Sequence, residues 1–324
     1  MKNKTLVAGA VAFATILAAF NATAQDTYPT RPIRFIVPAS PGGGTDFTAR
    51  TIGQKLSELI GQTVIVDNRG GAAGNIGVEI ASKASPDGYT LVMPITSFSI
   101  NPHLYKKLPF DTAKDFAPIV LASSAPLFLV VNPSVPAKSV SDLIALAKAK
   151  PGQLNYANSG NGTTAHLAGE LLKKMAKVDI VSVPYKGGGP AVISLIAGQV
   201  QMYFSTIPAA LTQVKADKLR GIAVTTTKRV DLIPEIPTVA ESGLPGFEVV
   251  GWFGIFVPAG TPKHIIATLN RSINQALQAP ETQQRFARQG LIPGGGTAEE
   301  LGKFLHAEMK KWGALIKEIG LASN

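Results

Sequence analysis

Short runs of apolar, often β-branched residues alternate with helix-like segments, and this alternation limits the fold more than any other feature. It occurs in the N-terminal third of the chain and again in the middle. Strands that alternate with helices are typical of βαβ units, in which helices cover a parallel sheet. The sequence therefore predicts an α/β fold with two doubly wound units of similar size.

The expected elements can be assigned to each unit in turn. In the first unit we expect strands at 33–37, 63–66 and 89–93 and helices at 46–60 and 74–84. In the second unit we expect strands at 127–131, 154–157, 180–183 and 221–225 and helices at 139–150, 163–177 and 190–197. Further helices begin at Pro262 and Thr297. Ligands of such sheets bind beyond the carboxyl ends of the strands, which directs attention to the turns there.

The last expected helix carries an apolar stripe at i, i+3 and i+4 spacing. Its members are Leu301, Phe304, Leu305, Met309, Trp312, Leu315, Ile316 and Ile319. Such a stripe needs a sheet to cover, so we expect both chain ends to build one discontinuous lobe. Lobe I would comprise residues 25–125 and 248–324, and lobe II residues 126–247. Connecting segments within 116–126 and 245–256 would cross between the lobes and form a hinge.

The N-terminus predicts export. Lys2 and Lys4 precede an apolar run at 6–20, and Ala22-Thr23-Ala24 has the small-residue pattern of a processing site. The run is shorter than the roughly 20 residues that span a membrane. We predict a signal peptide at 1–24, cleaved after Ala24, and a periplasmic mature protein; an uncleaved anchor is the alternative. The chain has no cysteine, so its fold depends on buried apolar area.

Charge argues against a nucleic-acid partner. The formal net charge is +10 at pH 7, but Lys and Arg are scattered, with no run of five like charges. That distribution is typical of a solvated basic surface. We therefore expect no nucleic acid to bind.

A first glycine-rich turn, Pro41-Gly42-Gly43-Gly44-Thr45-Asp46, leads from a strand into a helix. Unpaired N–H groups and a partial charge of roughly +0.5 at a helix N-terminus favour an anion there. Phe47 replaces the last glycine of a dinucleotide fingerprint, and no phosphate-loop motif is present. A tight turn capped by Thr45 or Asp46 is the alternative. The candidate ligand-binding residues are Pro41, Gly42, Gly43, Thr45 and Asp46.

A second turn, Ser159-Gly160-Asn161-Gly162-Thr163-Thr164, interleaves hydroxyl groups with glycines. Hydroxyl groups can donate to an anion, and glycines allow the backbone to approach it closely. A flexible turn with a threonine cap is the alternative. His166, just inside the helix, either contacts the ligand or orients the loop. The candidates are Ser159, Gly160, Gly162, Thr163, Thr164 and His166.

A third turn runs from Val183 to Ala191. Its Tyr185 and Lys186 can reach a carboxylate, although a lysine there is more often an ordinary surface charge. The candidates are Tyr185, Lys186 and Gly187.

A fourth glycine-rich stretch, Pro293-Gly294-Gly295-Gly296-Thr297, has the composition of the first turn. Thr297 followed by Glu300 is a capping box, which predicts a purely structural turn. Composition alone therefore does not identify a site.

Signatures of common enzymes are missing from the sequence. It has no G-x-S-x-G or H-E-x-x-H motif, and His103, His166, His264 and His306 are isolated. We therefore expect a binding function with no catalytic residue, no metal and no cofactor.

The chain resembles the extracytoplasmic solute-binding proteins of tripartite tricarboxylate transporters, the Bug-type receptors, from Tyr28 through the C-terminal helix. The matching segments are Tyr28-Pro29-Thr30-Arg31-Pro32-Ile33, Pro41-Gly42-Gly43 with Asp46 and Ala49-Arg50, Asn68-Arg69-Gly70-Gly71-Ala72, Ser85-Pro86-Asp87-Gly88-Tyr89, Asn101-Pro102-His103-Leu104-Tyr105, the Ser159 and Tyr185 turns, Pro237-Thr238-Val239-Ala240-Glu241, and Trp252-Phe253-Gly254 leading to Pro258-Ala259-Gly260-Thr261-Pro262.

The resemblance implies a Venus flytrap of the periplasmic binding protein type II class, which encloses a carboxylate between its lobes. Backbone amides, hydroxyls and waters of the first two turns would hold the ligand, with the Tyr185 turn nearby. Family patterns often place Asp where this chain has Ser194 and Gln201. Ser205, near the end of the following strand, is a candidate replacement contact.

The function implied is a periplasmic receptor that delivers a small organic acid, a mono-, di- or tricarboxylate, to the membrane subunits of a transporter. The receptor would act as a monomer. Two alternatives from other classes are a secreted hydrolase of unknown substrate and a ligand sensor or scaffold without a transport role.

Overall fold

Ten strands form one mixed sheet in the part of the chain that the computed structural model describes, residues 28–185, 187–318 and 320–321. Residues 31–324 belong to one unit. The predicted signal peptide and the cleavage site after Ala24 lie outside the described residues. None of the helices described is both long and apolar enough to cross a membrane.

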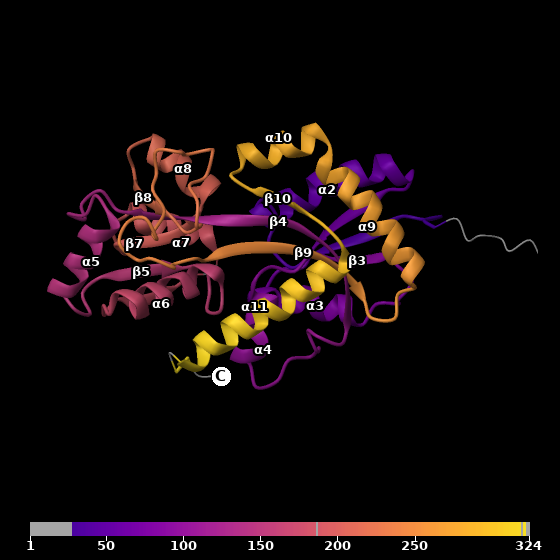
Figure 1. The fold of residues 1–324 in the computed structure, drawn as a ribbon, viewed down its shortest axis with the longest axis horizontal. Coiled ribbons are helices and arrows are strands. Elements are labelled where there is room, and N and C mark those ends of the chain that lie inside the picture. Colours follow the sequence, from indigo (N-terminus) through magenta and orange to yellow (C-terminus); the bar gives the residue numbers. More distant parts are fainter. Residues whose placement is uncertain (1–27, 186, 319, 322–324) are drawn as a thin grey trace, which may run out of the picture. The chain divides into compact units, whose positions relative to one another are not determined.

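The first lobe, which we call lobe I, is built on a parallel order β2-β1-β3 that β9 extends antiparallel. Its strands are β1 (Ile33–Val37), β2 (Val64–Asn68), β3 (Thr90–Val92), β9 (Val250–Pro258) and β10 (Ile292–Gly295). Figure 1 shows one group of helices on each face of this sheet. One group is α2 (Gly44–Ile60), α9 (Lys263–Gln278) and α10 (Pro280–Arg288); the other is α3 (Asn75–Ser82), α4 (Ser97–Leu104) and α11 (Ala298–Glu318).

The second lobe, lobe II, has the parallel order β7-β5-β6. Its strands are β5 (Asn155–Asn158), β6 (Val181–Pro184), β7 (Met202–Thr206) and β8 (Arg220–Val224). Its helices are α5 (Val140–Ala149), α6 (Thr164–Ala176), α7 (Gly188–Ile196) and α8 (Ile207–Lys215). The two doubly wound lobes that the alternation predicts are therefore present.

One long strand, β4 (Phe116–Val131), runs from lobe I into lobe II. It pairs with β9 as far as Pro126 and with β7 and β8 from Leu127 onward, always antiparallel. The segments 116–126 and 245–256, which we expected only to connect the lobes, thus contribute to β4 and β9, side by side in Figure 1. Hydrogen bonding between the two crossings satisfies backbone groups that a bare linker would expose.

The strands and helices predicted from periodicity do not include α4, α8, α10, β7 or β10. Pro102 interrupts α4, and β10 reads Ile-Pro-Gly-Gly. A Cβ on Gly294 would lie 2.2 Å from the carbonyl oxygen of Leu121, so close strand pairing explains this glycine. The predicted capping box is confirmed, because Glu300 Oε2 accepts from Thr297 N–H at 2.7 Å and Thr297 Oγ1 accepts from Glu300 N–H at 3.1 Å.

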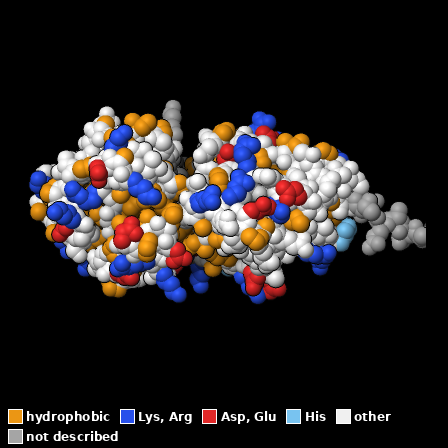
Figure 2. All heavy atoms as spheres, turned by 90° about the horizontal axis from the view of Figure 1, so that it is seen from above, with side chains coloured by type: hydrophobic (Ala, Val, Ile, Leu, Met, Phe, Trp, Pro, Cys, Tyr) orange, Lys and Arg blue, Asp and Glu red, His pale blue; other side chains and the backbone are white. Residues whose placement is uncertain are grey.

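Two buried apolar clusters support the lobes. The cluster of lobe I contains Phe98, Phe116, Phe256, Leu301 and Leu305. The larger cluster surrounds the strands of lobe II and also takes in Leu104 of α4 and Trp312, Leu315 and Ile316 of α11. Of the apolar stripe predicted on the last helix, the members buried on the two sides of the hinge are Leu301, Leu305, Trp312, Leu315 and Ile316. Phe304 and Met309 are partly buried, and Ile319 lies outside the described residues. On the face drawn in Figure 2, Lys and Arg are dispersed among Asp and Glu, as the sequence predicts.

Candidate functional site

The first glycine-rich turn ends at Gly43, which is the N-cap of α2 and offers no side-chain cap. The expectation that Thr45 or Asp46 caps the helix is therefore wrong, because both lie inside its first turn. The N–H groups at this end remain without an intrahelical acceptor. Pro41, Gly42 and Gly43 are exposed, and the Thr45 hydroxyl has no hydrogen-bond partner among the described residues.

Asp46 points back into the turn. Its Oδ2 accepts from the Gly42 N–H at 3.0 Å, and Oδ1 lies 2.9 Å from Arg50 Nε. Burial alone would raise the pKa of Asp46, but hydrogen bonds from Arg50, the Gly42 backbone and Asn68 together hold it below its usual value. These contacts hold Asp46 within the turn, and its role as a ligand contact stays a prediction.

In the second turn, the side chains of Thr163 and His166, both predicted ligand contacts, form hydrogen bonds within the turn itself. Thr163 is the N-cap of α6: its Oγ1 accepts from His166 N–H at 3.4 Å and donates to the Gly160 carbonyl at 2.7 Å. His166 Nδ1 in turn accepts from the Gly162 N–H at 3.2 Å. Burial lowers the pKa of His166, so the neutral ring is favoured. Of the two roles considered for His166, these contacts show the loop-orienting one.

Thr164 is the residue of this turn with a free hydroxyl. It is half-buried, and its Oγ1 has no hydrogen-bond partner among the described residues. A Cβ on Gly251 of β9 would lie 3.7 Å from this oxygen. The start of α6 therefore faces β9, which we call the hinge strand.

The start of α2 faces the same strand. A Cβ on Gly44 would lie 3.7 Å from Cζ of Phe253. Because side chains alternate along a strand, Gly251 and Phe253 lie on one face of β9. The structure thus brings two helix N-termini, one from each lobe, to one face of the hinge strand.

The third turn lies beside the second but is tied into lobe II. Tyr185 N–H donates to the Asn158 carbonyl at 2.9 Å, and the Tyr185 hydroxyl is hydrogen-bonded to Ser194. Gly187 is the N-cap of α7 with a φ of +104°. Lys186, the remaining candidate, lies outside the described residues.

The two positions where the chain departs from the family pattern serve contacts within lobe II. Ser194 Oγ binds Tyr185 and donates to Gln199 Oε1 at 2.9 Å. Gln201 Oε1 accepts from the Asn155 N–H at 2.8 Å and so links β5 to β7. Both side chains therefore shape the lobe.

Sequence reasoning missed Tyr203 and Asn101. Burial raises the pKa of Tyr203 to about 12, opposed by a hydrogen bond with the Ser159 side chain, and its hydroxyl would lie 3.3 Å from a Cβ on Gly188. Ser205, predicted, is two residues further along the same strand face; it is buried, and its hydroxyl has no partner among the described residues. Tyr203 and Ser205 are two residues apart near the end of one strand, and this spacing could have predicted from the sequence that both side chains lie on the same face.

Asn101 lies on α4 of lobe I, opposite the second turn. Its Nδ2 donates to Asn75 Oδ1 at 2.6 Å, while its buried Oδ1 has no partner among the described residues. A Cβ on Gly162 would lie 3.3 Å from that oxygen and 2.7 Å from Cδ1 of Leu104. The glycine loop of lobe II therefore packs directly against lobe I, and only a glycine fits there without a shift. The weak periodicity of α4 concealed this partner.

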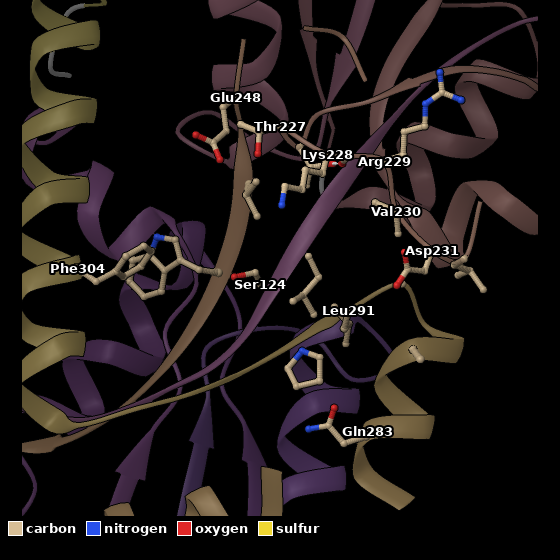
Figure 3. Close-up of a pocket in the computed structure, with 18 of the residues that line it drawn as sticks. Ser124, Thr227, Lys228, Arg229, Val230, Asp231, Glu248, Gln283, Leu291 and Phe304 are labelled. Carbon is tan, nitrogen blue, oxygen red and sulfur yellow. Dashed lines mark hydrogen bonds between the residues drawn. The ribbon is translucent and has the colours of Figure 1, made fainter. Parts of the chain in front are cut away.

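A hollow of about 740 Å³ lies on the opposite face of β9, where Trp252 forms part of its wall. Figure 3 shows Lys228 and Thr227 above it, Leu291 and Gln283 below it and Phe304 of α11 beside it. None of the ligand-binding residues predicted from the sequence lines this hollow. The starts of α2 and α6, with the free hydroxyls of Thr45 and Thr164, lie on the other face of β9, which we take as the candidate site.

The chemistry on the face of β9 that carries Gly251 and Phe253, which we call the cleft-side face, suits an anion. N–H groups and the dipoles of α2 and α6 converge there, with the hydroxyl groups of Thr45 and Thr164 as further donors. Within the described residues no three His, Cys, Asp or Glu side chains are placed to hold a metal ion.

Comparisons with known proteins show the family of the chain. The model of the tripartite tricarboxylate transporter family receptor matches residues 48–321. BugT of Bordetella pertussis is 38% identical over 297 residues, which is 91% of this chain and 91% of BugT. The structure of R. palustris Rpa4515 with adipate has a TM-score of 0.86 at 37% identity, covering 91% of this chain and 99% of that one.

A further solved structure, MatC from Rhodopseudomonas palustris with bound malate, has a TM-score of 0.81 at 30% identity and covers 89% of this chain and 100% of that one. The fold is that of the type II solute-binding proteins among which these structures fall. The chain belongs to the tripartite tricarboxylate transporter receptor family.

Proposed function

We propose that this protein is a periplasmic receptor that captures a small organic carboxylate between two lobes and delivers it to the membrane subunits of a tripartite tricarboxylate-type transporter. Lobe I would comprise residues 25–125 and 248–324, and lobe II residues 126–247. The change of partners along β4, between Pro126 and Leu127, supports this division.

The observation that carries the proposal is the convergence of two helix N-termini, one from each lobe, on one face of β9. A carboxylate there would accept hydrogen bonds from both lobes, so it would bind their close arrangement more tightly than a separated one. Such differential affinity shifts the population toward closure. Hydrogen bonds to a charged group contribute about 1.5–3 kcal/mol each, and a handful supply the roughly 8 kcal/mol of micromolar binding.

A dicarboxylate is the ligand class that fits best. Each helix N-terminus would take one carboxylate group, and the solved relatives carry adipate and malate. Backbone amides would donate most of the hydrogen bonds to the ligand in this arrangement. The width of the cleft would then select the length and shape of the ligand's carbon chain.

The proposed action is binding without catalysis, by a monomer and without a cofactor. The family comparison supports binding without catalysis, because the matching model describes receptors. A secreted hydrolase would need a nucleophile held by a base, whereas the buried His166 engages the backbone of its own loop.

Thermal unfolding with a panel of acids tests the function. Adipate, malate, citrate, acetate and benzoate are added to the mature protein, with sodium chloride at equal ionic strength as the control. An acid at about 100 times its Kd should add about 2.7 kcal/mol of stability and raise the Tm. A flat response to every acid would contradict the proposed function.

A further inference from the structure

Both tryptophans of the chain donate to one carboxylate oxygen. The sequence contains two tryptophans. Trp252 Nε1 lies 3.0 Å and Trp312 Nε1 2.8 Å from Oε2 of Glu308. Glu308 is only 8% exposed, and Lys311 Nζ lies 3.7 Å from its other oxygen. A buried carboxylate that accepts two N–H donors fixes the positions of both indoles.

The two indoles belong to different parts of the fold. Trp252 is in β9 and packs in the cluster of lobe I. Trp312 is in the second half of α11 and packs in the cluster that surrounds the strands of lobe II. Glu308 therefore joins the hinge strand to the second half of α11, a helix of lobe I whose C-terminal half packs into the cluster around the strands of lobe II. We call Glu308, Trp252 and Trp312 the hinge clamp.

The hinge clamp and the proposed ligand site occupy opposite faces of the same three residues of β9. Gly251 and Phe253 face the starts of α6 and α2, while Trp252 between them faces Glu308. If β9 tilts when a ligand binds on the face of Gly251 and Phe253, the Trp252 indole on the other face must therefore also move relative to α11.

The large hollow gives this part of the hinge room to move. Trp252, Glu308 and Phe304 line it together with residues 226–232 of lobe II and with Gln283, Ala287 and residues 290–293 of lobe I. Because opposite walls come from different lobes, as Figure 3 shows around Lys228 and Leu291, rotation of the lobes changes its width. A packed interface at this place would instead resist rotation.

We propose that the hinge clamp is a conformational device that favours the close arrangement of the lobes, and that Glu308 is its positioning residue; this rests on the proposed capture of a ligand between lobes. In the structure the clamp is intact while Gly162 of lobe II packs against Leu104 of lobe I. Removing the carboxylate charge weakens both indole bonds and allows α11 to separate from β9. The separated state then becomes more populated, and the ligand binds more weakly.

Glu308→Gln is the variant that tests this, with Glu299→Gln as the matched control. Glu299 lies on the same helix, but it is exposed and pairs with Lys303. The chain has no cysteine, so spin labels can be attached at Lys148→Cys in α5 and Arg271→Cys in α9, two exposed positions on different lobes. Electron–electron double resonance then measures the distance between the lobes without any ligand.

The expected result is a longer or broader interlobe distance in Glu308→Gln than in Glu299→Gln, and a red-shifted tryptophan emission. Affinity for the acid that stabilises the protein most should fall about tenfold. Unchanged distances and affinity, with or without altered emission, would overturn the hinge clamp. If no acid binds the wild type, the proposed function fails, and the distance measurement still decides the clamp. Should Glu308→Gln not fold, Trp252→Phe and Trp312→Phe each remove one N–H donor and are measured in its place.

Discussion

The two glycine-rich turns that begin α2 and α6 look alike in the sequence and are built differently. The first ends in a glycine N-cap and leaves the start of α2 without a side-chain cap, while Asp46 is fixed by Arg50. The second is capped by Thr163 and held by His166. The two turns therefore differ in the donors that remain after their own hydrogen bonds are made, and these are the donors that we propose bind the ligand.

The largest contrast should come from alanine at Gly42 and at Gly162. Both have positive φ, +83° and +77°, so each substitution costs about 1–2 kcal/mol of unfolding free energy in strain. At Gly42 a Cβ meets nothing within 4 Å, whereas at Gly162 it would lie 2.7 Å from Leu104 Cδ1. Gly162→Ala should therefore cost roughly 1–3 kcal/mol more in urea unfolding.

A double variant checks the cause of that contrast. Leu104→Ala combined with Gly162→Ala should be less destabilised than the sum of the two single variants, because the clash is relieved. Simple additivity would mean that lobe I does not touch Gly162 in solution.

Thr45→Val and Thr164→Val should weaken carboxylate binding next most strongly. Each removes a free hydroxyl from the start of one helix, and loss of a hydrogen bond to a charged ligand costs about 1.5–3 kcal/mol, or roughly tenfold to a hundredfold in Kd. Unfolding free energies should stay within about 0.5 kcal/mol of the wild type, since these hydroxyls have no partner among the described residues. Calorimetric titration would contradict the site if both variants bound as tightly as the wild type.

Thr163→Val, unlike Thr45→Val and Thr164→Val, should lower the free energy of unfolding. Loss of the α6 cap is expected to reduce the unfolding free energy by about 1 kcal/mol. Thr45→Val is its matched control, because Thr45 caps nothing in α2. Equal unfolding free energies for the two variants in urea would show that the turns are capped alike.

The smallest effect should appear in the pH dependence of stability. The pKa of His166 is lowered from 6.5 by burial, with Glu170 opposing and Lys173 adding to the shift, so the unfolded chain binds its proton more readily. Stability from neutral His166 is then complete above pH 6.5 and is lost as the pH falls through the lower folded pKa. His166→Asn keeps an acceptor for Gly162 and should be less sensitive in this window.

The first turn should depend on pH in a separate window. The pKa of Asp46 is lowered from 3.8, so its contribution is present above that value and is lost only as the pH falls through the lower folded pKa. Urea unfolding at pH 7, 5 and 3 separates the two turns, with Asp46→Asn as the second variant. A wild type whose stability is flat from pH 7 to 5 would contradict the role given to His166.

Periodicity was sufficient to predict most of the helices and, apart from β7, the parallel strands of both lobes. The turns at Thr45 and Thr164 could be predicted because a strand followed by glycines and a capped helix is a local pattern. The pairing of β4 with β9 is not local, since Pro126 and Val250 meet only in the fold. Their apolar, proline-flanked sequences therefore resembled linkers.

The inward contacts of the site also depend on the fold. Asp46 is a predicted ligand contact, and only the fold shows its hydrogen bonds to Gly42 and Arg50. Asn101 is missed for the same reason, because its proximity to Gly162 joins helices from different lobes. Sequence reasoning located the turns but could not assign the direction of each side chain.

A crystal structure of the protein with the acid that raises the Tm most would test the central claim directly. We predict carboxylate oxygens at about 3 Å from N–H groups in the first turns of both α2 and α6, close to the hydroxyls of Thr45 and Thr164. An acid seated instead in the hollow beside Trp252 and Lys228, with neither helix start contacting it, would contradict the account.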